Sequence, residues 1–385
     1  MACLLWVAGQ NKMNMDTKNR GRRHFLGTAA LTLVAAPFGL LGDAIAPWAV
    51  RDREAGEFAA GGPVGGRLDA GAPVAGRGGV VGNTPMGPLK QINAGLLNVG
   101  YAEAGPADGP VVLLLHGWPY DIHSYADVAP LLVAKGYRVI IPYVRGCGTT
   151  QFLSSDTLRN GQPGAVAQDV IDLMDALKIK KAIIGGFDWG GRSANIVAAL
   201  WPERCKAMVS VSGYLIASPA ANKVPLPPAA EYQWWYQFYF ATERGALGYD
   251  KYRHDFGKLI WEIASPKWAF DDATFQRTAA AFDNPDYATV VISNYRFRLG
   301  LVDGEAKYAD LEARLAKLPE ITVPTITLEG DANGAPHYPD DSAYRKRFTG
   351  KYANRVITGG IGHNLPQEAP RAFADAIVEA DGLAG

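Results

Sequence analysis

The chain has 385 residues, of which 48% are hydrophobic and 20% charged, so it is long enough for one large globular domain with an insertion. Its 38 Lys and Arg residues equal its 38 Asp and Glu residues, and this neutral balance argues against binding to nucleic acid or anionic membranes. Cys3, Cys147 and Cys205 lie far apart and form no metal or redox motif. Two unpaired thiols at Cys147 and Cys205 are the favoured interpretation, and a disulfide in an oxidising compartment is the alternative.

The N-terminal 88 residues are expected to lie outside the fold. Arg22-Arg23 precedes an apolar, Ala-rich run at 28–41, which is shorter than the ~20 residues of a spanning helix and is broken at Pro37. Residues 1–46 are therefore predicted to be a twin-arginine signal region, so that the protein is periplasmic or secreted. Residues 47–88 are rich in Gly, Ala and Pro and are interpreted as a flexible linker.

Past the linker, short apolar runs alternate with amphipathic stretches of helical spacing. Val111–Leu115 is five consecutive apolar residues, which suits a strand that is covered on both faces. This alternation predicts an α/β fold whose sheet is doubly wound and mostly parallel, with helices on both faces. Strands are expected at 89–92, 96–102, 111–115, 137–142, 182–184, 207–211, 322–328 and 355–358, and helices at 128–135, 166–177, 193–200 and 371–379.

The stretch 181–192 holds one carboxylate, Asp188, between a buried strand and a helix. The surrounding Gly186, Gly190 and Gly191 predict a sharp turn that lifts this side chain above the sheet, where strand and helix pass too close for Cβ atoms. A carboxylate is ionised at neutral pH and attacks saturated carbon by displacement. Asp in place of Ser at this position therefore moves the expected substrate from an ester to an epoxide or an alkyl halide. Simple N-capping by Asp188 is the alternative, although capping does not require three glycines.

Residues 214–304 break the alternating pattern and show no strand of the main sheet. Seven aromatic residues fall within 231–240, and helical segments are expected at 249–264, 271–282 and 287–299. We therefore predict a helical cap over 214–304 that roofs Asp188 and is inserted into a core formed by 89–213 and 305–385.

Two loops after strands are the candidates for an oxyanion hole. His116-Gly117-Trp118-Pro119 follows the strand at 111–115, and Trp189 follows the predicted nucleophile. The backbone amides of Trp118 and Trp189 are the predicted donors. His116 is expected to hold the loop and not to act as a base.

An acid and a histidine follow the later strands. Asp331 lies after the strand at 322–328, and His363 lies in a glycine-rich loop after the strand at 355–358. The chain order nucleophile, acid, histidine assigns Asp188, Asp331 and His363 to a triad. Competing choices for the acid are Asp340, Asp341 and an acid after the sixth strand.

These motifs together resemble the α/β-hydrolase superfamily from about Leu89 to the C-terminus, and within it the epoxide hydrolase and haloalkane dehalogenase group. Epoxide hydrolases of this group raise two cap tyrosines over the nucleophile to donate hydrogen bonds to the epoxide oxygen. The resemblance implies that Tyr236, in Tyr236-Gln237-Phe238-Tyr239-Phe240, and Tyr295, before Arg296, are these tyrosines. Packing in the cap core is the alternative for both.

The resemblance implies an epoxide hydrolase that forms an ester on Asp188 and releases a vicinal diol. No metal or organic cofactor is implied, and the expected partner is a small apolar electrophilic substrate. Trp118, Trp189, Trp235 and Tyr239 are the candidate substrate-binding residues.

Two other hypotheses remain at this stage. A haloalkane or haloacid dehalogenase would use the indole of Trp189 and a second donor such as Trp234, Trp235 or Trp261. The second hypothesis is a binding protein that has the same fold but catalyses no reaction. The presence of a nucleophile, an acid, a base and an oxyanion loop argues against it.

Overall fold

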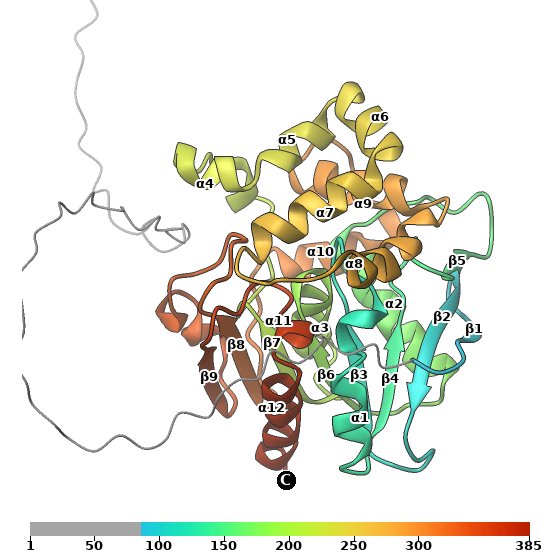
Figure 1. Ribbon diagram of the computed structural model, residues 1–385, viewed down its shortest axis with the longest axis vertical. Helices are drawn as coiled ribbons and strands as arrows, with labels where there is room; N and C mark the ends of the chain where they lie inside the picture. The colour runs from blue at the N-terminus through green and yellow to red at the C-terminus, as the bar shows by residue number, and fades with distance from the viewer. Residues whose placement is uncertain (1–85) are drawn as a thin grey trace, which may run out of the picture. The chain divides into compact units, whose positions relative to one another are not determined.

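The computed structural model describes residues 86–385, so the predicted signal region and nearly all of the linker lie outside the described residues. A nine-stranded sheet runs through this part of the chain in the order β1-β2-β4-β3-β6-β7-β8-β9, with β5 paired to β2 (Figure 1). The pairs β1·β2, β2·β4 and β2·β5 are antiparallel and the remaining pairs are parallel, which confirms the predicted mostly parallel α/β sheet. The strands are β1 (Lys90–Ala94), β2 (Leu97–Ala104), β3 (Val111–Leu115), β4 (Arg138–Pro142), β5 (Gln151–Phe152), β6 (Ala182–Gly186), β7 (Cys205–Val211), β8 (Thr325–Gly330) and β9 (Tyr352–Ile357).

The central strand β3 shows why the core has two sides. Val112 and Leu114 face one apolar cluster, and Leu113 and Leu115 face the other. Because successive side chains of a strand point to opposite faces, an uninterrupted apolar run fills both clusters. The helices α1 (Val128–Val133) and α12 (Pro370–Leu383) cover the first face, and α2 (Pro163–Ala176), α3 (Asp188–Leu200) and α10 (Ala309–Leu315) cover the second.

A group of helices between β7 and β8 lies over the carboxyl ends of the parallel strands (Figure 1). These helices occupy the segment that the sequence assigned to a cap. The helix expected at 249–264 is interrupted at Tyr252, which separates α6 from α7. They are α4 (Pro228–Gln233), α5 (Trp235–Ala241), α6 (Glu243–Lys251), α7 (Arg253–Ala264), α8 (Asp272–Ala279) and α9 (Tyr287–Arg298). The helix α11 (Leu365–Glu368) follows β9.

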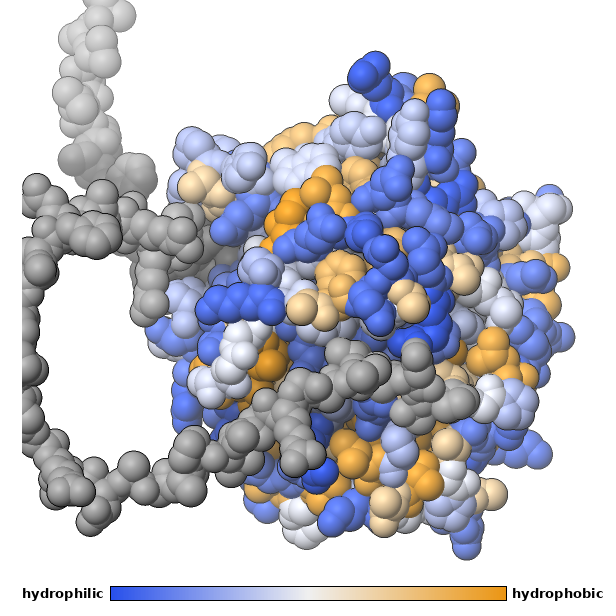
Figure 2. Space-filling model, viewed as in Figure 1, coloured by the Kyte–Doolittle hydropathy of each residue, from blue (hydrophilic) through white to orange (hydrophobic). Residues whose placement is uncertain are grey.

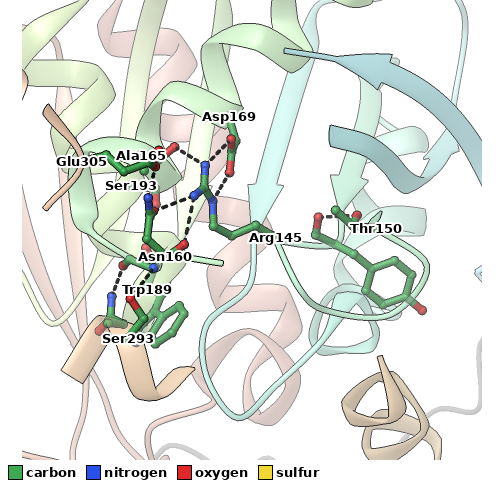
Figure 3. A network of polar contacts seen from close by, with 12 residues as sticks. Arg145, Thr150, Asn160, Ala165, Asp169, Trp189, Ser193, Ser293 and Glu305 are labelled. Carbon is green, nitrogen blue, oxygen red and sulfur yellow. Dashed lines mark hydrogen bonds and ion pairs between the residues drawn. The ribbon is translucent and has the colours of Figure 1, made fainter. Parts of the chain in front are cut away.

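A buried arginine fixes the loop after β4 (Figure 3). Arg145 is 2% exposed, and its guanidinium forms a bidentate pair with Asp169 of α2 at 2.6 and 2.7 Å. The same guanidinium donates to Asn160, whose side chain in turn donates to Glu305, just beyond the cap helices. A bidentate pair of this geometry is directional, so it fixes the loop against both α2 and the chain that returns from the cap.

Residues 86–385 carry two thiols in their interior and a largely hydrophilic surface on the face shown in Figure 2. Cys147 and Cys205 are both buried and unpaired, as the sequence analysis favoured. Hydrophilic residues cover most of the face shown in Figure 2, with hydrophobic residues in patches between them. Across residues 86–385, every helix is too short or too polar to traverse a bilayer.

Candidate active site

The turn between β6 and α3 presents Asp188 above the sheet. Asp188 has a φ of 52°, in the left-handed region that side chains other than glycine rarely adopt, while the preceding Phe187 is extended. Such strain persists only where the surroundings enforce it. The helix begins at the aspartate itself, five residues earlier than the sequence pattern indicated, because a positive φ conceals the start of a helix from periodicity.

Close backbone approaches enforce this turn. A Cβ on Gly190 would lie 1.9 Å from the carbonyl oxygen of Leu115, and one on Gly186 would lie 2.4 Å from the carbonyl of Gly190. A Cβ on Gly117 would lie 2.3 Å from the Cβ of Asp188. These three glycines therefore let two loops and one helix meet around a single carboxylate.

The two oxygens of Asp188 have different neighbours. Oδ1 accepts a 2.7 Å hydrogen bond from the backbone amide of Trp118, whereas Oδ2 lies 3.5 Å from Nε2 of His363. Burial would raise the pKa of the Asp188 carboxyl, but His363, the Trp118 amide and the positive charge of Arg192 outweigh burial and hold this pKa below its ordinary value. The carboxylate is therefore ionised at neutral pH.

The loop between β9 and α11 positions His363. Its backbone amide is hydrogen-bonded to the carbonyl oxygen of Ala264 and to Oγ of Ser265, both at the end of the cap helix α7. The side chain is 11% exposed. Its Nδ1 atom is buried and has no hydrogen-bond partner among residues 86–385.

The structure gives Asp331 partners other than His363. One carboxylate oxygen accepts from the amides of Gly360 and Ile361 at 2.8 and 2.9 Å, and the other accepts from the amide of Gly359 at 3.0 Å. These amides lower the pKa of Asp331, whose side chain is exposed. Asp331 shapes the loop that leads to His363, and within the described residues no hydrogen bond joins the two side chains.

Glu368, which the sequence analysis did not single out, is the carboxylate that binds the histidine loop directly. It accepts hydrogen bonds from the amides of Gly362 and Asn364 at 2.6 and 3.1 Å, and from Oγ of Ser265 at 2.7 Å. Burial raises the pKa of Glu368, and the neighbouring His363 partly opposes this effect. The sequence signal for Glu368 is its place in the first turn of a helix, where the free backbone amides stabilise a carboxylate.

Trp118 and Trp189 flank the nucleophile. The backbone amide of Trp118 donates a hydrogen bond to the carboxylate of Asp188, and within residues 86–385 the amide of Trp189 makes no such bond. The indole N–H of Trp118 donates to Tyr249 in the cap at 2.7 Å. The indole N–H of Trp189 is buried and has no hydrogen-bond partner in the described part of the chain.

Tyr236 and Tyr295 of the cap meet above these tryptophans. Their ring centroids are 5.3 Å apart, and each ring lies 5.3 Å from that of Trp118. Tyr295 also lies 6.0 Å from Trp189. Burial, together with the negative charge of Asp188, raises the pKa of both phenols well above the ordinary value, so both are protonated at neutral pH and able to donate.

Trp235 and Tyr239 lie one layer further out. Their rings pack on Phe256 at 5.3 and 5.6 Å, and Trp235 contacts Tyr236 at 6.1 Å. Within residues 86–385 they share no ring contact with Trp118 or Trp189. Their contacts place them behind Tyr236 in the cap.

His116 holds its loop, as the sequence suggested. Nδ1 contacts the carbonyl oxygen of Gly117 at 3.0 Å, and Nε2 accepts from the amide of Val144 at 3.2 Å. Burial lowers the pKa of His116, so the ring is neutral in this role.

Comparison with known proteins agrees with this geometry. The α/β hydrolase fold family matches residues 110–248. The solved structure of a candidate epoxide hydrolase from Klebsiella pneumoniae is 63% identical, with a TM-score of 0.76, and the match covers 76% of this chain and 97% of that one. Epoxide hydrolase B of Mycobacterium tuberculosis is 32% identical over 152 residues, which are 36% of this chain and 42% of that protein. Epoxide hydrolase A of the same organism is 23% identical over 304 residues, which are 72% of this chain and 92% of that protein.

The match to the Klebsiella protein spans nearly the whole of that protein. The chain therefore belongs to the α/β-hydrolase family. The chain matches less than half of the length of epoxide hydrolase B from Mycobacterium tuberculosis.

Proposed function

We propose that this protein is an epoxide hydrolase that opens its substrate by forming an ester on Asp188. The observation that carries the proposal is the position of an ionised carboxylate below two protonated cap phenols, Tyr236 and Tyr295. The similarity to three proteins named as epoxide hydrolases or candidates for that activity supports it.

We propose separate tasks for the two oxygens of Asp188, and their different neighbours support this proposal. Oδ1 is held by the Trp118 amide, whereas Oδ2 accepts from no backbone amide of residues 86–385, so Oδ2 is the oxygen that attacks the epoxide carbon. The carbon–oxygen bond of the ring breaks, and the oxygen that leaves receives a proton from the tyrosine pair. The product of this step is a monoester of a glycol.

His363 acts in the second step. Its Nε2 atom accepts a proton from water, and the resulting hydroxide attacks the ester carbonyl carbon of Asp188. Oδ1 carries the developing negative charge, which the Trp118 amide stabilises; loss of such a donor typically costs ~3 kcal/mol of transition-state stabilisation. Collapse of the tetrahedral intermediate breaks the bond to the glycol oxygen, which takes the proton held by His363 and leaves as a vicinal diol. The remaining proton of the Asp188 acid returns to the tyrosine pair, which restores the carboxylate and both phenols.

We propose that Asp331 is the acid that supports His363 and that the backbone amide of Trp189 is the second oxyanion donor. The three loop amides bound by Asp331 support an indirect role in placing His363. The Trp189 amide would approach the ester after a small movement, because it immediately follows the nucleophile at the start of α3.

A dehalogenase is the second candidate function, and the buried indole N–H of Trp189, which has no hydrogen-bond acceptor within residues 86–385, favours it. A halide leaving from carbon needs such donors, whereas an epoxide oxygen needs a proton.

The mass of intact His363→Ala protein after exposure to styrene oxide or 1-bromohexane separates the two functions. Without the base, the ester on Asp188 accumulates. A mass gain equal to the whole epoxide supports the proposal. A gain equal to the alkyl group minus one hydrogen, with release of bromide and no epoxide adduct, contradicts it and supports dehalogenation.

We also propose export through the twin-arginine route, which would place the protein in the periplasm or outside the cell. The pair Arg22-Arg23 followed by an apolar run supports this proposal. The full chain with a C-terminal tag is expected in the periplasmic fraction, and the variant with Arg22→Lys and Arg23→Lys in the cytoplasm. Equal cytoplasmic retention of both proteins would contradict export.

A further inference from the structure

Two arginines from different elements lie next to the tyrosine pair. Arg192 is on α3, four residues after Asp188, and Arg298 is the last residue of α9, three residues after Tyr295. Residues three or four apart on a helix share one face, so each arginine lies on the face that carries a proposed catalytic residue. The two guanidinium groups come from elements separated by about a hundred residues of sequence, and each interacts electrostatically with the other and with Asp188.

Ring contacts locate Arg298 beside the site. Its guanidinium carbon lies 4.0 Å above the ring of Trp234. The Trp234 ring lies 5.8 Å from that of Tyr236, which in turn contacts Tyr295. A guanidinium stacked on an indole keeps its N–H groups at its edge free to bind another group.

Neither arginine has an ion-pair partner among residues 86–385. Other arginines of the same region do: Arg145, Arg159 and Arg296 each hold a carboxylate within 3.0 Å. The Nε atom of Arg192 is buried and has no hydrogen-bond acceptor in the described part of the chain. A buried donor of a charged group left without an acceptor is costly, so this atom indicates a missing anion or polar partner.

The electrostatics show a surplus of positive charge. Burial and the nearby Arg192 lower the pKa of Arg298 to about 10, and the interactions with Tyr236, Tyr295 and Asp188 do not compensate for this. Two carboxylates that interact electrostatically with these arginines, Asp188 and Glu312, already have hydrogen-bond partners. Asp188 is bound by Trp118 and His363, and Glu312 accepts from the Gly164 amide and from the side chain of Gln162.

We infer that Arg192 and Arg298 bind a carboxylate carried by the substrate, so that the natural substrate is an anionic epoxide. This inference rests on the proposed function and names its substrate class. A carboxylate fits because a guanidinium presents a planar fork that matches its two oxygens, and because one negative charge balances the surplus at the site. It replaces the expectation of a purely apolar substrate.

The matched substrates for the test are 4-(oxiran-2-yl)benzoate and styrene oxide, which share the aryl epoxide and differ in one carboxylate. We expect the unmodified protein to favour the benzoate in kcat/KM by at least about tenfold, because a charge-assisted hydrogen bond in a partly buried site has this strength. Arg298→Gln and Arg192→Gln should each reduce this preference by about tenfold, and Arg298→Lys by less. Arg244→Gln removes one charge from an exposed position on α6 and should leave the preference unchanged.

A second measurement does not depend on turnover. Phenylacetate carries the carboxylate without the epoxide, and its binding can be followed by tryptophan fluorescence, since Trp234 lies under Arg298. Binding should weaken at least about tenfold in Arg298→Gln and stay unchanged in Arg244→Gln.

The outcomes separate the inference from the proposed function. Equal kcat/KM for both epoxides, or a preference and phenylacetate affinity that persist in Arg298→Gln, would overturn the inference while leaving the epoxide hydrolase intact. Absence of adduct with either epoxide on His363→Ala, together with Arg298-dependent binding of phenylacetate, would overturn the proposed function and leave the carboxylate site standing.

Discussion

The turn between β6 and α3 and the loop between β9 and α11 supply the two principal reacting groups, and they are built in opposite ways. In the turn, Gly186 and Gly190 allow close backbone contacts, and Gly117 of the loop after β3 leaves room for the side chain of Asp188. In the loop, His363 is held through its backbone by Ala264 and Ser265 of the cap, and its Nδ1 atom has no partner within residues 86–385. The nucleophile is therefore held by the sheet and its turn, whereas the base is held jointly by the end of a cap helix and by Glu368 of the core.

Removing the nucleophile tests the first half of this contrast. Asp188→Asn keeps the shape of the side chain and its ability to accept from the Trp118 amide, so the fold should survive. Turnover of epoxides should fall by about 10⁴-fold or more, as is typical when a catalytic nucleophile is removed by substitution. Steady-state assays beside a thermal melt provide the check. An activity within tenfold of the unmodified protein would show that attack does not come from Asp188.

Removing the phenolic hydroxyls tests the contribution of the cap to ring opening. Tyr236→Phe and Tyr295→Phe should each slow formation of the ester by about 10²-fold, and the double variant by more, because a proton donor of this kind contributes about 10²–10⁴-fold. The rate is best measured in the His363→Ala background by the mass of the intact protein. Tyr232→Phe is the control, since Tyr232 is 78% exposed on α4. Unchanged rates in the double variant would assign both tyrosines to packing.

Substitution of two carboxylates, Glu368 and Asp331, distinguishes direct from indirect support of the loop that carries His363. Glu368→Gln should slow hydrolysis of the ester by about tenfold, because its charge-assisted bonds to Gly362, Asn364 and Ser265 become neutral. Asp331→Asn should have the smaller effect on this rate, because Asp331 binds only loop amides two to four residues before His363. The reverse order would restore Asp331 as the acid that supports the base.

The smallest effect is expected on stability. Loop amides depress the pKa of Asp331 below its ordinary value of 3.8, so the folded state gains from the ionised carboxylate above that pH. Asp331→Asn should lower the Tm at pH 7, and the difference from the unmodified protein should vanish as the pH falls through the depressed pKa. Thermal melts between about pH 2 and pH 7 measure this. A difference that is constant over this range would show that the charge of Asp331 contributes nothing.

The sequence predicted those parts of the fold and site that depend on local spacing. Val111–Leu115 reads as a strand buried on both faces, and the glycines around Asp188 predict a strained turn, as the structure shows. The position of Asp331 was harder to foresee, because its partners at 359–361 lie about thirty residues away and bind it through backbone amides that carry no side-chain signature. The pairing of Arg192 with Arg298 could not be predicted from the sequence either, because only folding of the cap brings α9 beside α3.

The bonds from Ala264 and Ser265 to His363 have a consequence for recombination within this family. A chimera that exchanges residues 214–304 for the cap of a relative replaces not only the roof of the site but also the anchor of its base. Such a graft retains turnover only if its own chain brings a carbonyl and a hydroxyl to the same backbone amide of His363. Substrate range and hydrolysis of the ester are thus inherited together, and the practical boundary for swapping caps lies before the end of α7.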